Sequence, residues 1–256
     1  MNHLILFCDY GLDDAAATVT VFAHHKRFDR IDLVPIGGNV PVDVSYRNCH
    51  TLLAQFPHIL HKIRLVDTRG VPQSEEYLAH IHGGDGMGDL LSPATVSVTT
   101  VDYNIWLDGL SGEERVLSLG PMTLVRPLME RHPHPLVVMG GCVNTPPNFH
   151  GYEFNHALDK DAFAFCAPKA EGVITLDTCR VAALDVRNWV LEGDDLYTKI
   201  LRRDVQLSYT RGEDGCYVWD DVAAQFMLFP HRFGVKKETD PYGNTYRHAC
   251  YVGEKN

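Results

Sequence analysis

Positive charge is scarce in this sequence. Its 256 residues include 23 Lys and Arg against 33 Asp and Glu, which gives a formal net charge of −10. A chain with this balance has no broad basic face that could hold nucleic acid or an anionic membrane. The composition therefore indicates a small molecule or another protein as the partner.

Paired cysteines and long apolar runs are also missing. The seven cysteines are odd in number, widely spaced and without a Cys-x-x-Cys pair. They predict buried thiols in a reducing compartment instead of disulfides or a zinc site. The opening residues MNHLILFCDY are too short for the apolar region of a signal peptide. No run approaches the roughly 18 apolar residues of a membrane helix, so we expect a cytoplasmic protein.

Short apolar runs alternate with amphipathic stretches along most of the chain. Strand-like runs lie at 3–8, 31–38, 63–67, 115–120, 135–141 and 172–177. Helical patterns lie at 13–25, 42–56, 121–131, 159–166, 193–205 and 217–228. The alternation predicts an α/β fold, with a mostly parallel sheet covered by helices on both faces. We expect one domain over 1–256, with a Gly-rich loop at 68–92 and no clear pattern in the tail 231–256.

Three carboxylates lie within six positions where the first predicted strand gives way to a helix. Two of them, Asp13 and Asp14, could simply complement the positive end of that helix. Asp9 is harder to explain in this way, because a carboxylate at the end of so apolar a strand needs a partner, a hydrogen bond or a metal. Three oxygen ligands at the carboxyl end of a strand, where parallel sheets bind ligands, suit a hard cation such as Ca²⁺ or Mg²⁺.

The segment LFCDYGLDDAAA at 6–17 resembles the N-terminal signature of the inosine-uridine preferring nucleoside hydrolases, Asp-x-Asp-Pro-Gly-x-Asp-Asp-Ala. Phe7 stands where the first Asp is usual and Tyr10 replaces Pro, whereas the other three acids are kept. Further motifs similar to those of the family follow in order, between residues 3 and 228: Gly38-Asn39, Ile81-His82-Gly83-Gly84-Asp85-Gly86-Met87-Gly88, Leu119-Gly120-Pro121-Met122-Thr123, Met139-Gly140-Gly141, Glu153-Phe154-Asn155, Leu184-Asp185-Val186 and Val218-Trp219-Asp220.

The resemblance implies a Rossmann-like nucleoside hydrolase fold and a calcium-dependent enzyme. Such an enzyme cleaves the N-glycosidic bond of a ribonucleoside to free base and ribose, as in nucleoside catabolism and purine salvage. The implied calcium ligands are the carboxylates of Asp9, Asp14 and Asp220 and the backbone carbonyl of Leu119. Asp9 would also take a proton from the attacking water as general base. The family further implies a homodimer or a homotetramer.

The same resemblance divides the implied nucleoside contacts between two parts of the sugar. Asp13 and Asn39 would hold ribose hydroxyls, with Asn155 beside them. The residues implied at the 5′-hydroxyl are Glu153, Asn148 and Met139, with Asn144 as a rival to Asn148 because the alignment needs a one-residue gap. Each also has an ordinary explanation: a turn for Asn39, a solvated charge for Glu153 and core packing for Met139.

Trp219 stands where many family members carry a His that protonates the departing base. An indole has no acidic proton at neutral pH, so this position cannot supply an acid. The purine-preferring branch of the family carries Trp there, which implies that Trp219 stacks on a purine and that the chain favours purine nucleosides. His82 is the other candidate for the acid. A buried Trp or a His in a Gly-rich loop can also be purely structural.

Two other functions are compatible with these residues. The first is a non-catalytic member of the same fold that binds ribose or a nucleoside, which Phe7, Tyr10 and the short chain suggest. Release of free ribose would distinguish the enzyme from the binder. The second is a metal-dependent phosphohydrolase that uses the same acids. The sequence has no Lys or Arg cluster near the proposed site to hold phosphate, which favours the nucleoside hydrolase over this alternative.

Overall fold

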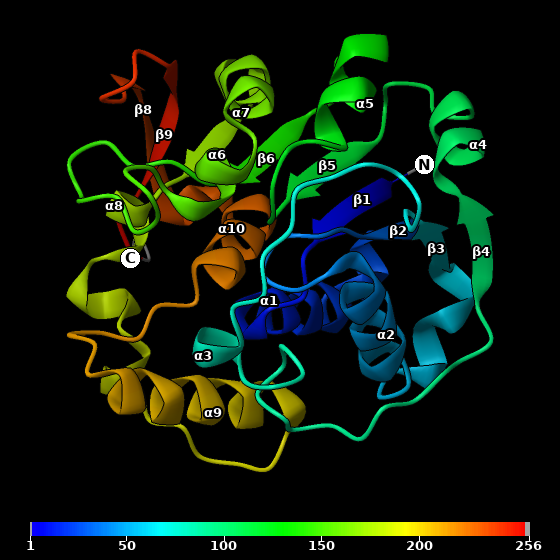
Figure 1. Cartoon of the computed structure of the whole chain (residues 1–256), viewed down its shortest axis with the longest axis horizontal. Coiled ribbons are helices and arrows are strands. Elements are labelled where there is room, and N and C mark those ends of the chain that lie inside the picture. The colour runs from blue at the N-terminus through cyan, green and yellow to red at the C-terminus, as the bar shows by residue number, and fades with distance from the viewer. Residues whose placement is uncertain (1, 254–256) are drawn as a thin grey trace.

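The computed structural model describes residues 2–253, and a nine-stranded sheet forms its centre (Figure 1). The strands run in the order β4-β3-β2-β1-β5-β6-β7-β9-β8. Neighbours pair in parallel except for β8 and β9, which are antiparallel. The strands are β1 (His3–Cys8), β2 (Arg30–Pro35), β3 (Ile63–Asp67), β4 (Thr99–Asp102), β5 (Arg115–Ser118), β6 (Leu136–Met139), β7 (Gly172–Ile174), β8 (Phe233–Thr239) and β9 (Thr245–Tyr251). The predicted mostly parallel sheet is confirmed.

Helices cover both faces of the sheet, as predicted (Figure 1). They are α1 (Leu12–Ala23), α2 (Val42–Leu53), α3 (Ala79–His82), α4 (Tyr103–Asp108), α5 (Val125–Arg131), α6 (Phe154–Leu158), α7 (Lys160–Cys166), α8 (Leu176–Cys179), α9 (Leu196–Arg211) and α10 (Trp219–Leu228). Side chains of β1 alternate between two cores. Leu4 and Leu6 join the core that contains α1 and α10, whereas Ile5 and Phe7 join the core that contains α4 and α5. A strand buried on both faces explains the continuous apolar run.

The C-terminal tail differs most from the sequence-based expectation. It forms a hairpin of β8 and β9 that extends the sheet beyond β7. β8 contains the polar run Lys236-Lys237-Glu238 and is largely exposed, so it lacks the apolar pattern that marks the central strands. The polar strand β4 at the opposite edge was missed for the same reason.

Several predicted boundaries also shift. The run expected as a strand over 172–177 ends at Ile174, because Thr175 caps the short helix α8. The predicted loop at 68–92 contains the one-turn helix α3. The helix expected at 193–205 begins after its cap Asp195 and continues to Arg211, where Gly212 ends it in the left-handed region with φ 70°. Within residues 2–253, no helix has both the length and the apolar character needed to span a bilayer.

Candidate active site

The turn between β1 and α1 holds its acids through backbone hydrogen bonds. Asp14 Oδ1 accepts from the backbone N–H of Asp9 at 3.0 Å, and its Oδ2 accepts from that of Gly11 at 2.8 Å. Tyr10 between them has φ 38°, and its buried hydroxyl donates to Cys49 Sγ at 3.3 Å. A proline cannot adopt this φ, so Tyr10 builds a turn that a proline at the same position could not.

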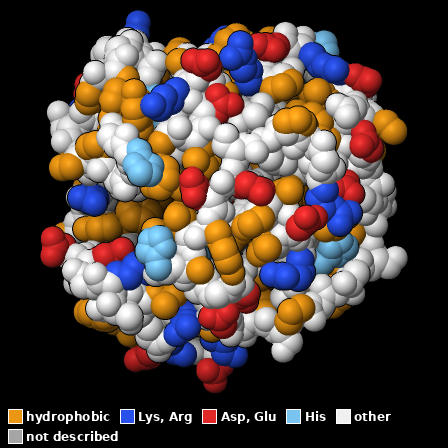
Figure 2. All heavy atoms as spheres, in the orientation of Figure 1, with side chains coloured by type: hydrophobic (Ala, Val, Ile, Leu, Met, Phe, Trp, Pro, Cys, Tyr) orange, Lys and Arg blue, Asp and Glu red, His pale blue; other side chains and the backbone are white. Residues whose placement is uncertain are grey.

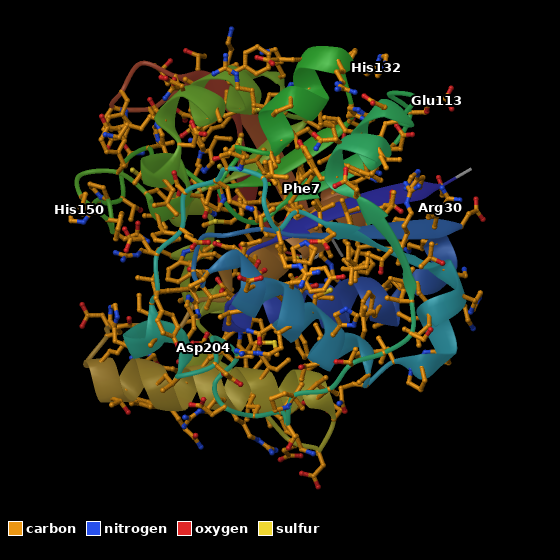
Figure 3. The ribbon with its side chains drawn as sticks, turned by 45° about the vertical axis from the view of Figure 1, so that its right-hand side comes forward. Phe7, Arg30, Glu113, His132, His150 and Asp204 are labelled. Atoms are coloured by element: carbon orange, nitrogen blue, oxygen red, sulfur yellow. The ribbon has the colours of Figure 1, made fainter. Side chains whose placement is uncertain are left out.

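Phe7, the other departure from the family signature, lies away from this turn. Its side chain is fully buried in the core beneath α4 and contacts Trp106 edge-on, with ring centroids 6.1 Å apart. Figure 3 shows it near the middle of the sheet. The missing acid therefore changes the packing of one core and leaves the other three acids at the end of β1 in place.

Three buried carboxylates converge at the carboxyl end of the sheet. One oxygen from each of Asp13, Asp14 and Asp220 lies within 4.8 Å of the others. Asp220 comes from the first turn of α10, which packs against α1. The Oδ1 atoms of Asp13 and Asp220 are buried and have no hydrogen-bond partner among the described residues. Buried, unpartnered carboxylate oxygens fit a divalent cation.

Asp9 lies against Asn39 beside this group. Its fully buried Oδ2 accepts from the backbone N–H of Asn39 at 2.8 Å, and its Oδ1 accepts from Asn39 Nδ2 at 3.3 Å. Asn39 Nδ2 also donates to Asp14 Oδ2 at 3.3 Å, which links the two acids. The closest set of three carboxylates thus contains Asp13, expected at the ribose, whereas Asp9, expected on the cation, adjoins it.

Electrostatics sets these four acids apart from ordinary surface carboxylates. Burial is the largest cause that raises the pKa of Asp9, Asp13, Asp14 and Asp220 above its usual range. The negative charges of neighbouring carboxylates raise the pKa of Asp9, Asp13 and Asp220 further. A group of acids that repel one another in a buried site is stabilised by a bound cation.

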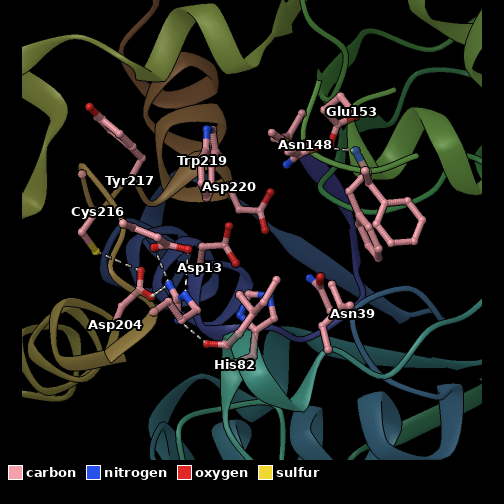
Figure 4. Close-up of a pocket in the computed structure, with 18 of the residues that line it drawn as sticks. Asp13, Asn39, His82, Asn148, Glu153, Asp204, Cys216, Tyr217, Trp219 and Asp220 are labelled. Atoms are coloured by element: carbon pink, nitrogen blue, oxygen red, sulfur yellow. Dashed lines mark hydrogen bonds and ion pairs between the residues drawn. The ribbon is translucent and has the colours of Figure 1, made fainter. Parts of the chain in front are cut away.

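A pocket of about 500 Å³ opens over the acids (Figure 4). On the space-filling view, the same face of the molecule is hollowed on its left side, with hydrophobic side chains in the depression (Figure 2). The residues expected at the site from the sequence that line the pocket are Asp13, Asn39, His82, Leu119, Met139, Asn148, Glu153, Asn155, Trp219 and Asp220. Asn144 is not among the residues that line it, which favours Asn148 over its rival.

The helix α6 organises one side of the pocket. Glu153 caps this helix, and its carboxylate accepts from the backbone N–H groups of Gly141, Asn155 and His156 at 2.8–3.0 Å. Asn155 Nδ2 donates to the carbonyl of Leu119 at 2.7 Å. That carbonyl keeps a second lone pair for a cation. Asn148 Oδ1 accepts a hydrogen bond from the backbone N–H of Phe154 at 3.0 Å. This side of the pocket is therefore preformed without a ligand.

His82 does not have the surroundings of a proton donor. Its Nδ1 accepts from the backbone N–H of Leu12 at 3.2 Å, which places the proton of the neutral ring on Nε2. Burial, with the nearby charge of Arg211, lowers the pKa of His82 to about 3. A neutral ring disfavours His82 as the acid, and its role as the acid stays a prediction.

Trp219 is the first residue of α10, and its half-buried side chain lines the pocket. Its Nε1 is buried and has no hydrogen-bond partner among the described residues. Tyr217 lies beside it, with ring centroids 6.0 Å apart and an interplanar angle of 48°. The two rings make this part of the pocket wall aromatic.

Sequence reasoning missed a further group of residues in the pocket wall. These residues come from the residue that follows α8, from α9 and from the loop after α9: Arg180, Asp204, Arg211, Glu213, Asp214, Cys216 and Tyr217. They follow no strand and belong to none of the recognised motifs. A polar face on the helix α9 could have indicated Asp204 and Arg211, whereas the loop residues carry no such pattern.

Comparison with known proteins places the chain among its relatives. The profile of the family described as inosine-uridine preferring nucleoside hydrolase matches residues 4–252. The chain belongs to this family. A curated relative, the non-specific ribonucleoside hydrolase RihC of Salmonella paratyphi B, is 28% identical over 221 residues. The match covers 77% of this nucleoside hydrolase family member and 66% of that relative, just under two thirds of its length.

Solved nucleoside hydrolases share the fold of this family member. The purine-preferring ribonucleoside hydrolase from Gardnerella vaginalis superposes with a TM-score of 0.73 at 19% identity, over 98% of this chain and 93% of that one. A plant nucleoside hydrolase gives a TM-score of 0.74 at 18% identity, over 98% and 94% of the two chains. The predicted α/β nucleoside hydrolase fold is confirmed.

Proposed function

We propose that this chain is a metal-dependent enzyme that hydrolyses the N-glycosidic bond of ribonucleosides to free base and ribose. The observation that carries the proposal is the group of buried carboxylates, with unpartnered oxygens, that opens into a pocket of about 500 Å³. That volume falls within the roughly 300–1,000 Å³ of pockets that bind small molecules. Membership of the family supports the same reaction.

The carboxylates would hold Ca²⁺, because this cation binds several oxygen ligands and tolerates varied coordination geometry. Its proposed ligands are Asp9, Asp14, Asp220 and the carbonyl of Leu119, and Asp13 lies close enough to Asp14 and Asp220 to belong to the same shell. When bound, the cation supplies positive charge that makes a nearby water more acidic.

Side chains that line the pocket, together with the buried Asp9 beneath it, would each have a separate role in the reaction. Asp9 takes the proton of the attacking water as general base, and its hydrogen bonds to Asn39 fix the direction of its carboxylate. Asp13 and Asn39 bind ribose hydroxyls. The remaining sugar contacts are Asn148, Glu153 and Asn155 with Met139 beside them, on the wall that α6 organises. These contacts orient C1′ toward the water. Positive charge develops on the sugar in the transition state, and the nearby carboxylates stabilise it.

Assays of ribose release from the common nucleosides test this function. We expect free ribose and free base from at least one purine nucleoside, and no release of phosphate from nucleotides. Binding of nucleosides without any ribose release would instead identify a non-catalytic member of the family.

Trp219 gives a prediction about the preferred base. Stacking on a purine offers more contact area than stacking on a pyrimidine, and aromatic pairs contribute about 0.5–1.5 kcal/mol beyond burial. We therefore expect inosine and guanosine to be cleaved better than uridine and cytidine. Trp219→Ala should lower kcat for purine nucleosides more than it raises KM, because the contact strengthens as the base leaves.

A matched variant separates stacking from packing. Trp219→Phe keeps an aromatic face and should recover part of the lost rate, whereas Ala should not. Unchanged purine turnover in Trp219→Ala, or a parent that prefers pyrimidines, would make Trp219 a packing residue.

The assembly of the chain is a separate proposal. One sheet runs through the described residues, which supports a single domain over 1–256. Membership of the family supports a homodimer or homotetramer, which sedimentation of the purified chain would establish.

A further inference from the structure

One end of the pocket contributes nothing to the sugar contacts or to the acid group. Figure 4 shows Asp204, Cys216 and Tyr217 on the side opposite Glu153 and Asn148. The carboxylates of Asp13 and Asp220 lie between the two ends (Figure 4). A nucleoside whose sugar occupies the Glu153 end would therefore direct its base toward α9 and the loop after it.

The departing base needs a proton, and neither Trp219 nor the expected acid, His82, is suited to supply it. Trp219 has no acidic proton, and His82 is neutral with its Nδ1 occupied by Leu12. Burial raises the pKa of the Cys216 thiol and of the Tyr217 hydroxyl, so both stay weak acids. Asp204 is the remaining buried acid at this end of the pocket.

Asp204 lies on α9, and its side chain lines the pocket. Asp204 and Arg211 are seven residues apart, two helical turns, and so lie on one face of the helix. Arg211 donates to the carbonyl of Ile81 at 2.7 Å and makes two bonds of 2.7 Å to the carboxylate of Glu213. Its guanidinium is therefore largely engaged elsewhere, and its Nη2 stays 4.0 Å from Asp204 Oδ1.

Asp204 is thus a buried acid whose nearest counter-ion among the described residues, Arg211, lies 4.0 Å away. It is 7% exposed, and among the described residues its Oδ2 accepts a hydrogen bond from the thiol of Cys216 alone, at 3.5 Å. Burial is the main cause that raises the pKa of Asp204 to about 6, with a smaller contribution from the charge of Glu213, and Arg211 and Cys216 act in the opposite direction. Asp13 is the acid that faces it from α1.

We propose that Asp204 is the acid that protonates the leaving base, which rests on the proposed nucleoside hydrolysis. The C1′–N bond breaks with its electron pair passing to the base, and the carboxyl proton of Asp204 moves to a ring nitrogen of that base. The oxygen of water bonds to C1′, and the proton of that water passes to Asp9. Solvent then returns a proton to Asp204 and removes one from Asp9, so one water is consumed per turnover.

The test compares two substrates that differ in their need for an acid. Inosine leaves as a basic anion that needs a proton, whereas p-nitrophenyl β-D-ribofuranoside releases p-nitrophenolate, which leaves without one. Asp204→Asn should lower kcat for inosine by about 10²-fold, the lower range for general acid catalysis, and change kcat for the nitrophenyl riboside little. The matched control is Asp194→Asn, an exposed acid just before α9 that lies outside the pocket and should leave both rates unchanged.

A pH profile gives a second measurement that needs no variant. In the parent, the ratio of kcat/KM for inosine to that for the nitrophenyl riboside should fall as pH rises through about 6, because Asp204 loses the proton that only inosine needs. Effects on Asp9 and on the cation are common to both substrates and cancel in the ratio.

The outcomes separate the role of Asp204 from the reaction itself. A flat ratio, or equal losses for both substrates in Asp204→Asn, would overturn the proposed role while leaving the hydrolysis intact. If Asp204→Asn does not fold, the profile of the parent decides. A parent that cleaves neither substrate would overturn the proposed hydrolysis, and the role of Asp204 with it.

Discussion

Asp9→Asn should reduce ribose release by about 10²–10⁴-fold, the range expected when a general base is removed. The carboxylate is fully buried, and Asn39 donates a hydrogen bond to each of its two oxygens. Asparagine has nearly the same shape but accepts no proton from water and brings no charge to a cation. The loss should therefore appear in kcat, measured as ribose released from inosine at saturating substrate.

A neighbouring acid provides the control for this variant. Asp221 is also buried, but Thr20, Tyr197 and Gln225 donate hydrogen bonds to it and it does not line the pocket. Asp221→Asn should keep most of the turnover, whereas Asp9→Asn should lose it, although each variant replaces a buried carboxylate that accepts hydrogen bonds. Activity of Asp9→Asn within a few-fold of the parent would show that another group accepts the proton.

Gly38→Ala should lower kcat by about 10²-fold, as expected for a displacement of roughly 1 Å in a reacting group. A Cβ atom at position 38 would lie 1.9 Å from Asp9 Oδ2 and 2.8 Å from Asp9 Cβ. Because the contact reaches the Cβ of Asp9 as well as its carboxylate, rotation of the side chain cannot relieve it. Either Asp9 or the loop that carries Asn39 must move, and both fix the general base.

The control for the glycine variant is Gly234→Ala in β8. Its added Cβ would meet only Val252 Cγ1 at 3.5 Å, an ordinary contact, far along the sheet from the acids. This variant should match the parent in ribose release. Should Gly38→Ala also retain full activity, the placement of Asp9 by its neighbours is not important for turnover.

The centre of the fold could be predicted because its strands bury both faces. The run at 3–8 is apolar on both sides, and the structure places alternate side chains in two cores. The hairpin of β8 and β9 could not be predicted in this way. Lys236 and its neighbours are exposed on an edge strand, where pairing is set by the adjacent strand and not by burial.

The candidate site was predictable where chemistry follows a strand and unpredictable where it does not. Asp9 and Asn39 follow β1 and β2, and the structure brings them together by hydrogen bonds. Which of Asp9 and Asp13 binds the cation and which binds ribose depends on distances of a few ångströms. Spacing along the sequence does not determine such distances. Asp204 lies on the long helix α9, where only the tertiary packing shows that a carboxylate turns inward and loses its solvent.

The most direct test is ribose release from inosine by protein from which divalent cations have been stripped with a chelator. The geometry of the buried acids predicts that stripped protein releases almost no ribose and that added Ca²⁺ restores release in a saturable manner. The same addition should raise the melting temperature, because a cation bound only to the folded state stabilises it. Full ribose release by stripped protein, unchanged on adding Ca²⁺, would contradict the proposed cation site at Asp9, Asp14, Asp220 and Leu119.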